Sequence, residues 1–215
     1  YYWSSNPRTS AVNIGSASAG YDFNINDYGT GDITASGNVT SGYSSSFNAR
    51  HGALALQNVS SNYGLTGNAI GDISFQTMTN ATSGTLSLTT TQGRIRPLGD
   101  NTTADISNAG NVTLTANHAS NGDIGDTAFA HPLDIVAGPA STVTLSAGKN
   151  IGAATKPVTI DTSGVISATS AGGQFHVAAQ DMAAIPKAVT SIKLSASAAG
   201  MGIGGTSTFA SQDMS

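Results

Sequence analysis

Short apolar runs alternate with polar residues at a period of two along much of the chain. One phrase recurs, in which two apolar residues two positions apart enclose a polar one. Successive side chains of an extended strand point to opposite faces, so this pattern predicts half-buried β-strands. The copies are Leu86–Thr90, Val112–Ala116, Val143–Ala147 and Ile192–Ala196, with Phe175–Ala179 as a looser copy in which His176 points outward.

A second phrase, a turn residue followed closely by Ile, comes after several of these strands. A third phrase begins with Pro and follows the second, at Pro132–Ile135 and Pro157–Ile160. Glycine and asparagine suit tight turns, and Pro is tolerated at the start of a strand. The second phrase occurs at Gly31–Thr34, Gly71–Ser74, Gly93–Arg96, Gly122–Gly125, Lys149–Gly152 and Gly202–Gly204.

The spacing between copies of the first phrase is uneven, because they begin at residues 86, 112, 143 and 175. Unequal spacing is typical of a parallel β-helix, in which each coil keeps its short strands and outward loops absorb insertions. We therefore predict an all-β fold, a single β-helix over residues 1–215, which we expect to be an internal part of a longer protein. The repeats are clearest over 84–205 and less regular over 1–80.

Composition supports strands rather than helices and narrows the range of partners. The chain has 26 Gly, only 9% charged residues, and no Glu among its 12 acidic residues. A net charge of −4 argues against nucleic acid as a partner. The chain contains no cysteine, so neither disulfides nor thiolate metal sites can hold the fold.

The recurring phrases resemble the repeats of the filamentous haemagglutinin family, the exported partners of bacterial two-partner secretion systems. The resemblance is carried by Val112–Ala116, Gly122–Gly125 and Pro132–Ile135, and again by Val143–Gly152 and Pro157–Ile160. It implies a right-handed parallel β-helix that is secreted through an outer-membrane two-partner secretion transporter. It also implies adhesion, biofilm cohesion or display of a distal toxin.

Residues 22–26 begin like a calcium loop, with oxygen ligands at Asp22, Asn24 and Asn26. The helix–loop–helix form of such a site fails, because Asp27 stands where Gly is required and Ile33 stands where Glu is required. On a strand these three polar residues face solvent together. We favour this outward polar ladder over a weak Ca²⁺ site, and predict no metal and no cofactor.

Other motifs give little support to catalysis. Gly200–Gly205 satisfies a dinucleotide-binding string, but the residues that follow do not open a helix, so we interpret its glycines as corner residues. The histidines have no ligand-like spacing, and the Asp residues fall mostly in Gly-Asp turns. We therefore predict no enzymatic activity and no catalytic residues. The histidines are His51, His118, His131 and His176.

Three further groups of residues are candidates for surface recognition. Exposed aromatic rings could stack on sugars, although aromatic residues more often cap a core or cover a loop. Arg94 and Arg96 share a face that could meet an acidic glycan, although a solvated strand face is the simpler interpretation. The aromatic group is Tyr1, Tyr2, Trp3, Tyr21, Tyr28, Tyr43 and Tyr63, and Asn-x-Ser/Thr sequons occur at Asn38, Asn58, Asn80, Asn101 and Asn111.

The sequence thus favours a structural or adhesive stalk of a secreted bacterial surface protein, located outside the cell or on its surface. Candidate partners are the transporter and a host receptor, glycan or matrix polysaccharide. One alternative is a carbohydrate-active β-helix enzyme, which would need clustered Asp and a basic residue in a groove. Another is a self-associating surface-layer or matrix protein, in which lateral contacts between rods matter more than a ligand.

Overall fold

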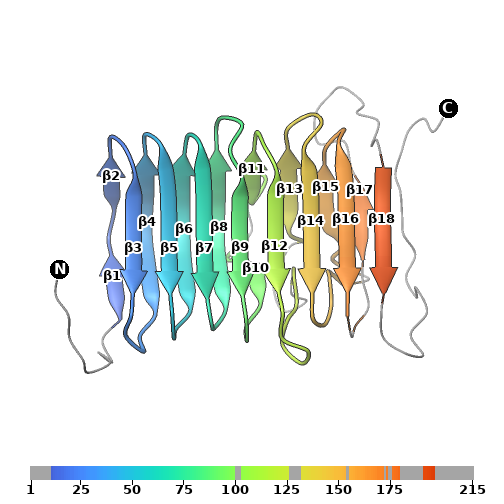
Figure 1. Cartoon of the computed structure of the whole chain (residues 1–215), viewed down its shortest axis with the longest axis horizontal. Coiled ribbons are helices and arrows are strands. Elements are labelled where there is room, and N and C mark those ends of the chain that lie inside the picture. Colours follow the sequence, from blue (N-terminus) through green and yellow to red (C-terminus); the bar gives the residue numbers. More distant parts are fainter. Residues whose placement is uncertain are drawn as a thin grey trace.

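The chain winds into a stack of coils made of parallel strands. A computed structural model describes residues 11–99, 103–125, 132–153, 155–171, 173, 176–179 and 191–196. In Figure 1 the strands of the near sheet run downward and those of the far sheet run upward as the chain advances from left to right. This is a right-handed parallel β-solenoid of about seven turns, which confirms the predicted fold class.

The near sheet, sheet B, has one strand from each coil, and every pairing in it is parallel. The sheet contains the four strands predicted from the closer copies of the first phrase. Its strands, in spatial order, are β3 (Phe23–Asp27), β5 (Ser44–Ala49), β7 (Gly64–Ala69), β9 (Leu86–Thr90), β12 (Val112–Ala116), β14 (Thr142–Ala147), β16 (Val165–Ser170) and β18 (Ser191–Ala196).

The far sheet, sheet A, has long strands in three successive coils, β4 (Ile33–Ser41), β6 (Leu54–Ser61) and β8 (Ile73–Asn80), and shorter strands on either side of them. The shorter strands are β1 (Val12–Ile14), β2 (Ala17–Ala19), β10 (Ile95–Pro97), β11 (Ile106–Asn108), β13 (Asp134–Ala137), β15 (Val158–Asp161) and β17 (Val177–Ala179). Ile95 of β10 pairs with Ile73 of β8. Beyond it, Ile124 and Ile151 each add one isolated parallel β-bridge to the same column of isoleucines. From Ile95 to Ile106 and from Ile124 to Ile135 the chain takes 11 residues, against 5 from Ile73 to Met78, so the later coils are longer.

The core is built from columns of identical or similar side chains that stack along the axis. Leu88, Leu114 and Leu145 are direct neighbours in register and are at most 1% exposed. The isoleucines of the second phrase form another buried column, in which Ile73, Ile95 and Ile124 pair in succession. A single coil could not bury these side chains, so coil stacking supplies the hydrophobic stabilisation.

The assignment of residues 175–179 as a copy of the first phrase is wrong. Val177 pairs with Val158 in sheet A, and so belongs to the column of the third phrase. The sheet B strand after β14 is β16, whose Ile166 pairs with Val143. Strand β16 was missed because Val165 and Ala168 do not reproduce the first phrase. His176, predicted to point outward, is buried at 8% exposure, which corrects that prediction.

Close stacking explains more corner glycines than backbone conformation does. Gly125 and Gly152 do adopt left-handed conformations, at φ 69° and 62°. Gly42 instead lies so near the preceding coil that a Cβ would be 2.2 Å from the carbonyl oxygen of Gly20. The conformational freedom that we predicted as the reason for glycine at the corners is therefore needed at only some of them. Within the described residues, no helix is long and apolar enough to cross a membrane.

Candidate functional site: the polar corners of the solenoid

Acidic and amide side chains at the corners hold the backbone of the following coil. The Asp32 carboxylate accepts the backbone N–H of Ala53 at 2.8 Å, 21 residues further along the chain. Asp72 and Asp123 stand at the equivalent position of later coils. They accept the N–H groups of Arg94 and Asn150 at 3.0 and 3.1 Å. Comparable bonds are Asp22 to Ser44, Asp105 to Asp134 and Asn111 to Thr142.

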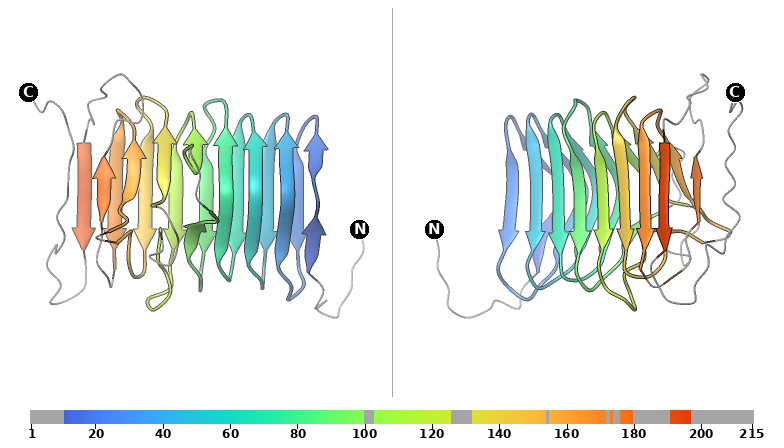
Figure 2. Two further views of the ribbon diagram at one scale, coloured as in Figure 1. Left: turned by 180° about the vertical axis from the view of Figure 1, so that it is seen from behind. Right: turned by 45° about the vertical axis from the view of Figure 1, so that its right-hand side comes forward.

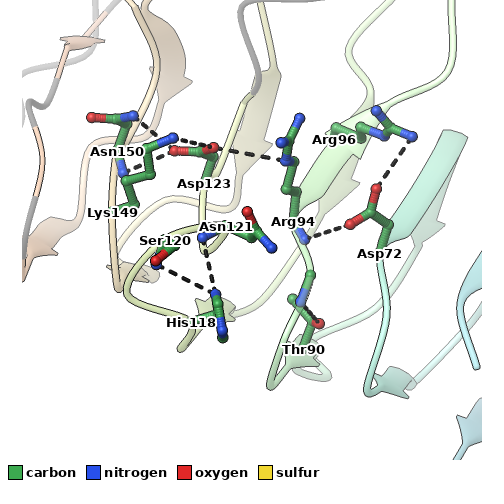
Figure 3. Close-up of polar contacts among 11 residues, drawn as sticks. Asp72, Thr90, Arg94, Arg96, His118, Ser120, Asn121, Asp123, Lys149 and Asn150 are labelled. Atoms are coloured by element: carbon green, nitrogen blue, oxygen red, sulfur yellow. Dashed lines mark hydrogen bonds and ion pairs between the residues drawn. The ribbon is translucent and has the colours of Figure 1, made fainter. Parts of the chain in front are cut away.

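A charged cluster has formed where three such corners follow one another (Figure 3). Because Ile73, Ile95 and Ile124 stack, the residues before them, Asp72, Arg94 and Asp123, lie in successive coils. Arg94 Nε lies 3.8 Å from Asp123 Oδ2.

Two further cations complete this cluster. Lys149 Nζ lies 3.6 Å from Asp123 Oδ2 on the side away from Arg94, as Figure 3 shows. A guanidinium nitrogen of Arg96 lies 3.3 Å from Asp72 Oδ2. These residues are up to 77 positions apart in the sequence, and the stacking of the coils brings them together.

The hydrogen bonds of Asp123 define what the cluster can do. Its side chain is 9% exposed, and its Oδ1 accepts both the N–H and the side-chain amide of Asn150. Its Oδ2 faces Arg94 and Lys149. A carboxylate with these four partners bridges three successive coils. The arrangement therefore acts as a clamp between coils.

Neighbouring polar groups also serve the turns. Nδ1 of His118 accepts the backbone N–H groups of Ser120 and Asn121 at 3.3 and 3.1 Å, which closes the turn after β12. The buried hydroxyl of Thr90 accepts the N–H of Gly93 at 3.0 Å and lies 2.6 Å from the carbonyl oxygen of Gly71. These side chains satisfy backbone groups that the change of direction would leave without partners.

Three of the predicted aromatic residues form an exposed stack at the corner that leads into sheet B. The rings of Tyr21 and Tyr43 are 5.1 Å apart and nearly parallel, and those of Tyr43 and Tyr63 are 4.7 Å apart. The three are 42–69% exposed, so they neither cap the core nor cover a loop. Both faces of Tyr43 are occupied, and a sugar could stack flat only at an end of the column, such as the outer face of Tyr21.

The two other groups of aromatic and cationic candidates have different surroundings. Tyr28 is exposed, and the guanidinium of Arg50 lies 4.2 Å from its ring centre. Arg94 and Arg96, considered as a patch for an acidic glycan, are half-buried and ion-paired with aspartates of adjacent coils. Tyr1, Tyr2 and Trp3 lie outside the described residues.

The polar ladder predicted for residues 22–26 is confirmed. Asn24 and Asn26 are exposed, whereas Phe23 and Ile25 pack against the core. The amide of Asn48 donates to Asn26 Oδ1 at 3.2 Å, which continues the ladder into the next coil. In the part of the chain that the structure describes, no group of three or more His, Cys, Asp or Glu residues could hold a metal ion.

The remaining histidines and glycines are scattered. His51 is exposed, His118 lies in a turn and His176 is buried. The described histidines therefore occupy different surroundings. His131 and Gly200–Gly205 fall outside the described residues.

The sequons differ in accessibility. Asn80 is 2% exposed and its amide donates to Asn108 Oδ1 at 2.7 Å, so it is closed to modification in the folded chain. Asn111 is exposed, but its oxygen accepts the N–H of Thr142. Asn38 and Asn58 are neighbours in register on the outer face of sheet A, joined by a hydrogen bond of 3.0 Å. Asn101 is not among the described residues.

One signal in the sequence could have revealed the charged cluster. Aligning the second phrase on its isoleucine places Asp32, Asp72, Arg94, Asp123 and Asn150 at one position. In parallel stacked coils, residues at equivalent positions become neighbours about 4.8 Å apart. The order Asp, Arg, Asp in consecutive coils would then have predicted alternating charge along that corner.

No known family matches this chain, and neither a curated protein nor a solved structure matches it.

Proposed function

We propose that this chain is a stalk segment of a secreted bacterial surface protein and contributes to attachment or to biofilm cohesion. The observation that carries the proposal is the use of the corner carboxylates. From Asp22 to Asp123 they accept backbone N–H groups of the next coil. These carboxylates join one coil to the next, as a stiff stalk requires.

The mechanical part of this role follows from the hydrogen-bond pattern. Each coil pairs with its neighbours through two parallel sheets and through the corner bonds. Bending or stretching the stack requires many of these bonds to break together, so repeated coils make a stiff rod. The proposed location is extracellular or on the cell surface, reached through an outer-membrane two-partner secretion transporter, as the resemblance to filamentous haemagglutinins implies.

The adhesive part rests on exposed features of the rod. The Tyr21–Tyr43–Tyr63 stack offers aromatic edges and phenolic hydroxyls to solvent. Flat amphipathic rings of this kind are common in recognition surfaces. The proposed partners are a host receptor, a glycan or a matrix polysaccharide.

Attachment is the property to measure first. Beads coated with the purified chain should adhere to host cells or to a biofilm matrix more than beads coated with the heat-unfolded chain. Pretreating the surface with glycosidases or with proteases distinguishes a glycan from a protein receptor. Adhesion equal to that of the unfolded control would overturn the adhesive role.

A direct assay separates the stalk from a carbohydrate-active enzyme. The chain is incubated with neutral and acidic polysaccharides, and new reducing ends are measured over time. We expect none above the buffer control. Cleavage that is lost in Asp123→Asn, a variant that keeps the size of the side chain, would replace the stalk proposal with an enzyme.

A further inference from the structure

The outer face of sheet B has an unusually uniform chemistry. Its strands alternate buried and outward positions, so β9 presents Ser87 and Thr89, and β12 presents Thr113 and Thr115. In every coil from β3 to β16, both outward positions that lie between the buried residues are Asn, Ser or Thr. No charged or aromatic side chain interrupts these two columns over those coils.

Parallel register turns this composition into a regular array. Thr113 pairs with Ser87 on one side and with Thr144 on the other, and Thr115 pairs with Thr89 and Ser146. Figure 1 shows the strands of this sheet lying side by side along the whole stack. The array therefore has the strand spacing of about 4.8 Å along the axis.

We infer that this face of sheet B is the surface through which two copies of the chain associate laterally, with the sheets packed face to face. This inference rests on the proposed stalk function and names the contact through which stalks would cohere. A second copy has the same spacing between coils, so hydroxyl and amide groups can meet their counterparts at every coil. Long flat sheets are commonly stabilised by such stacking.

Charge also favours a second copy on this face. The chain carries a net charge of −4, and like charges placed opposite one another are costly. In the described coils the charges near sheet B, such as Asp22 and Arg50, lie beyond the two columns, at the corners. Two copies can thus meet here without opposing like charges.

The area of the face sets the expected strength. Seven coils at about 4.8 Å and strands of about 17 Å give a face of roughly 500 Å² per copy. A pair would bury on the order of 1,000 Å², at the lower end for a specific interface. Short polar side chains lose little rotamer entropy on association, which offsets part of the small area. A weak dimer is the expected result.

Sedimentation velocity over a series of concentrations tests this contact. Thr115→Lys places a charge within the neutral face, where a second molecule would bury it without a partner, and should weaken self-association at least about ten-fold. Ser60→Lys is the matched control, because Ser60 is exposed on the opposite sheet. This control variant should change the dissociation constant of the dimer by less than about two-fold. Circular dichroism of both variants checks that they are folded.

Cysteine cross-linking provides an independent readout, since the chain has no cysteine of its own. Thr115→Cys should form covalent dimers through a short bis-maleimide faster than Ser60→Cys. A wild-type chain that stays monomeric at the highest concentration, or equal effects at the two positions, would overturn the inference. Capture by a neutral polysaccharide that Thr115→Lys abolishes, without dimers, would reassign the face to a glycan.

The bead assay separates this inference from the proposed function. Adhesion of the chain to its surface at dilutions where no dimer forms would leave the stalk role standing even if the lateral contact fails. Dimers without adhesion would leave the contact standing and remove the adhesive role.

Discussion

The carboxylate of Asp123 accepts two hydrogen bonds from Asn150, which lies one coil further along the solenoid. The backbone N–H donates at 3.1 Å and the side-chain amide at 2.8 Å. On its other oxygen Asp123 faces Arg94 of the preceding coil. One buried side chain thus connects three coils, and its loss should be felt as lost cohesion between them.

Asp123→Ala should lower the free energy of unfolding by about 1–3 kcal/mol, because it leaves the part-buried N–H of Asn150 without this acceptor and removes the anion between Arg94 and Lys149. Guanidinium unfolding followed by circular dichroism measures the change. Asp32→Ala is the control: Asp32 is exposed and accepts the N–H of Ala53, so we expect a loss of about 1 kcal/mol or less. Equal losses in the two variants would contradict the clamp described for Asp123.

Gly42→Ala should destabilise the chain by about 3 kcal/mol or more, because its Cβ would be 2.2 Å from the Gly20 carbonyl oxygen and the two coils would have to separate. Gly20→Ala, at the same corner one coil earlier, meets nothing within 4 Å and should change stability by less than about 1 kcal/mol. Thermal unfolding of the two variants makes the comparison. If both alanines are tolerated, close stacking is not the reason for glycine at this corner.

Leu114→Ala should cost about 2–5 kcal/mol, since Leu114 is fully buried between Leu88 and Leu145 and the stacked coils cannot collapse around the space that it leaves. Ile25→Ala, in the first coil of sheet B, should cost less because Ile25 is only partly buried. Hydrogen exchange of the β12 and β14 amides locates the effect. If Leu114→Ala lowered amide protection only in β3, the stacked column of Leu88, Leu114 and Leu145 would not be what Leu114 supports.

Tyr43→Ala removes the middle ring of the tyrosine stack and should lower stability by about 1 kcal/mol, because two ring pairs are lost at an exposed site. Tyr43→Phe keeps the ring and should behave like the original chain. The readouts are thermal unfolding and the near-ultraviolet circular dichroism that coupled tyrosines produce. An unchanged signal in Tyr43→Ala would show that the three rings do not stack in solution.

Local patterns in the sequence predicted much of the fold. The alternation in Val112–Ala116 and Val143–Ala147 identified two neighbouring strands and the residues that they bury, because side-chain direction in a strand depends only on parity. The second phrase, a turn residue followed closely by Ile, identified the corner isoleucines Ile95 and Ile124, which pair in the structure. Parity also placed Asn24 and Asn26 on the outer face.

The same patterns failed where a residue could satisfy more than one position in the coil. Val177 has the neighbours of a first-phrase strand but pairs with Val158 in sheet A. His176, placed outward by simple alternation, is buried. Which sheet a short strand joins is decided by the lengths of the preceding turns and by the free edge that the stack offers, and neither is a local property.

The sequence by itself determined that the chain forms short parallel strands in stacked coils, because alternation, turn residues and the need to bury isolated apolar runs are all local or compositional. Only the tertiary structure decided which residues from different coils meet. Arg94, Asp123 and Lys149 form one ionic cluster, and Tyr21, Tyr43 and Tyr63 form one stack. These contacts depend on the register between coils, which loops of unequal length set, so the distance between residues in the sequence could not reveal them.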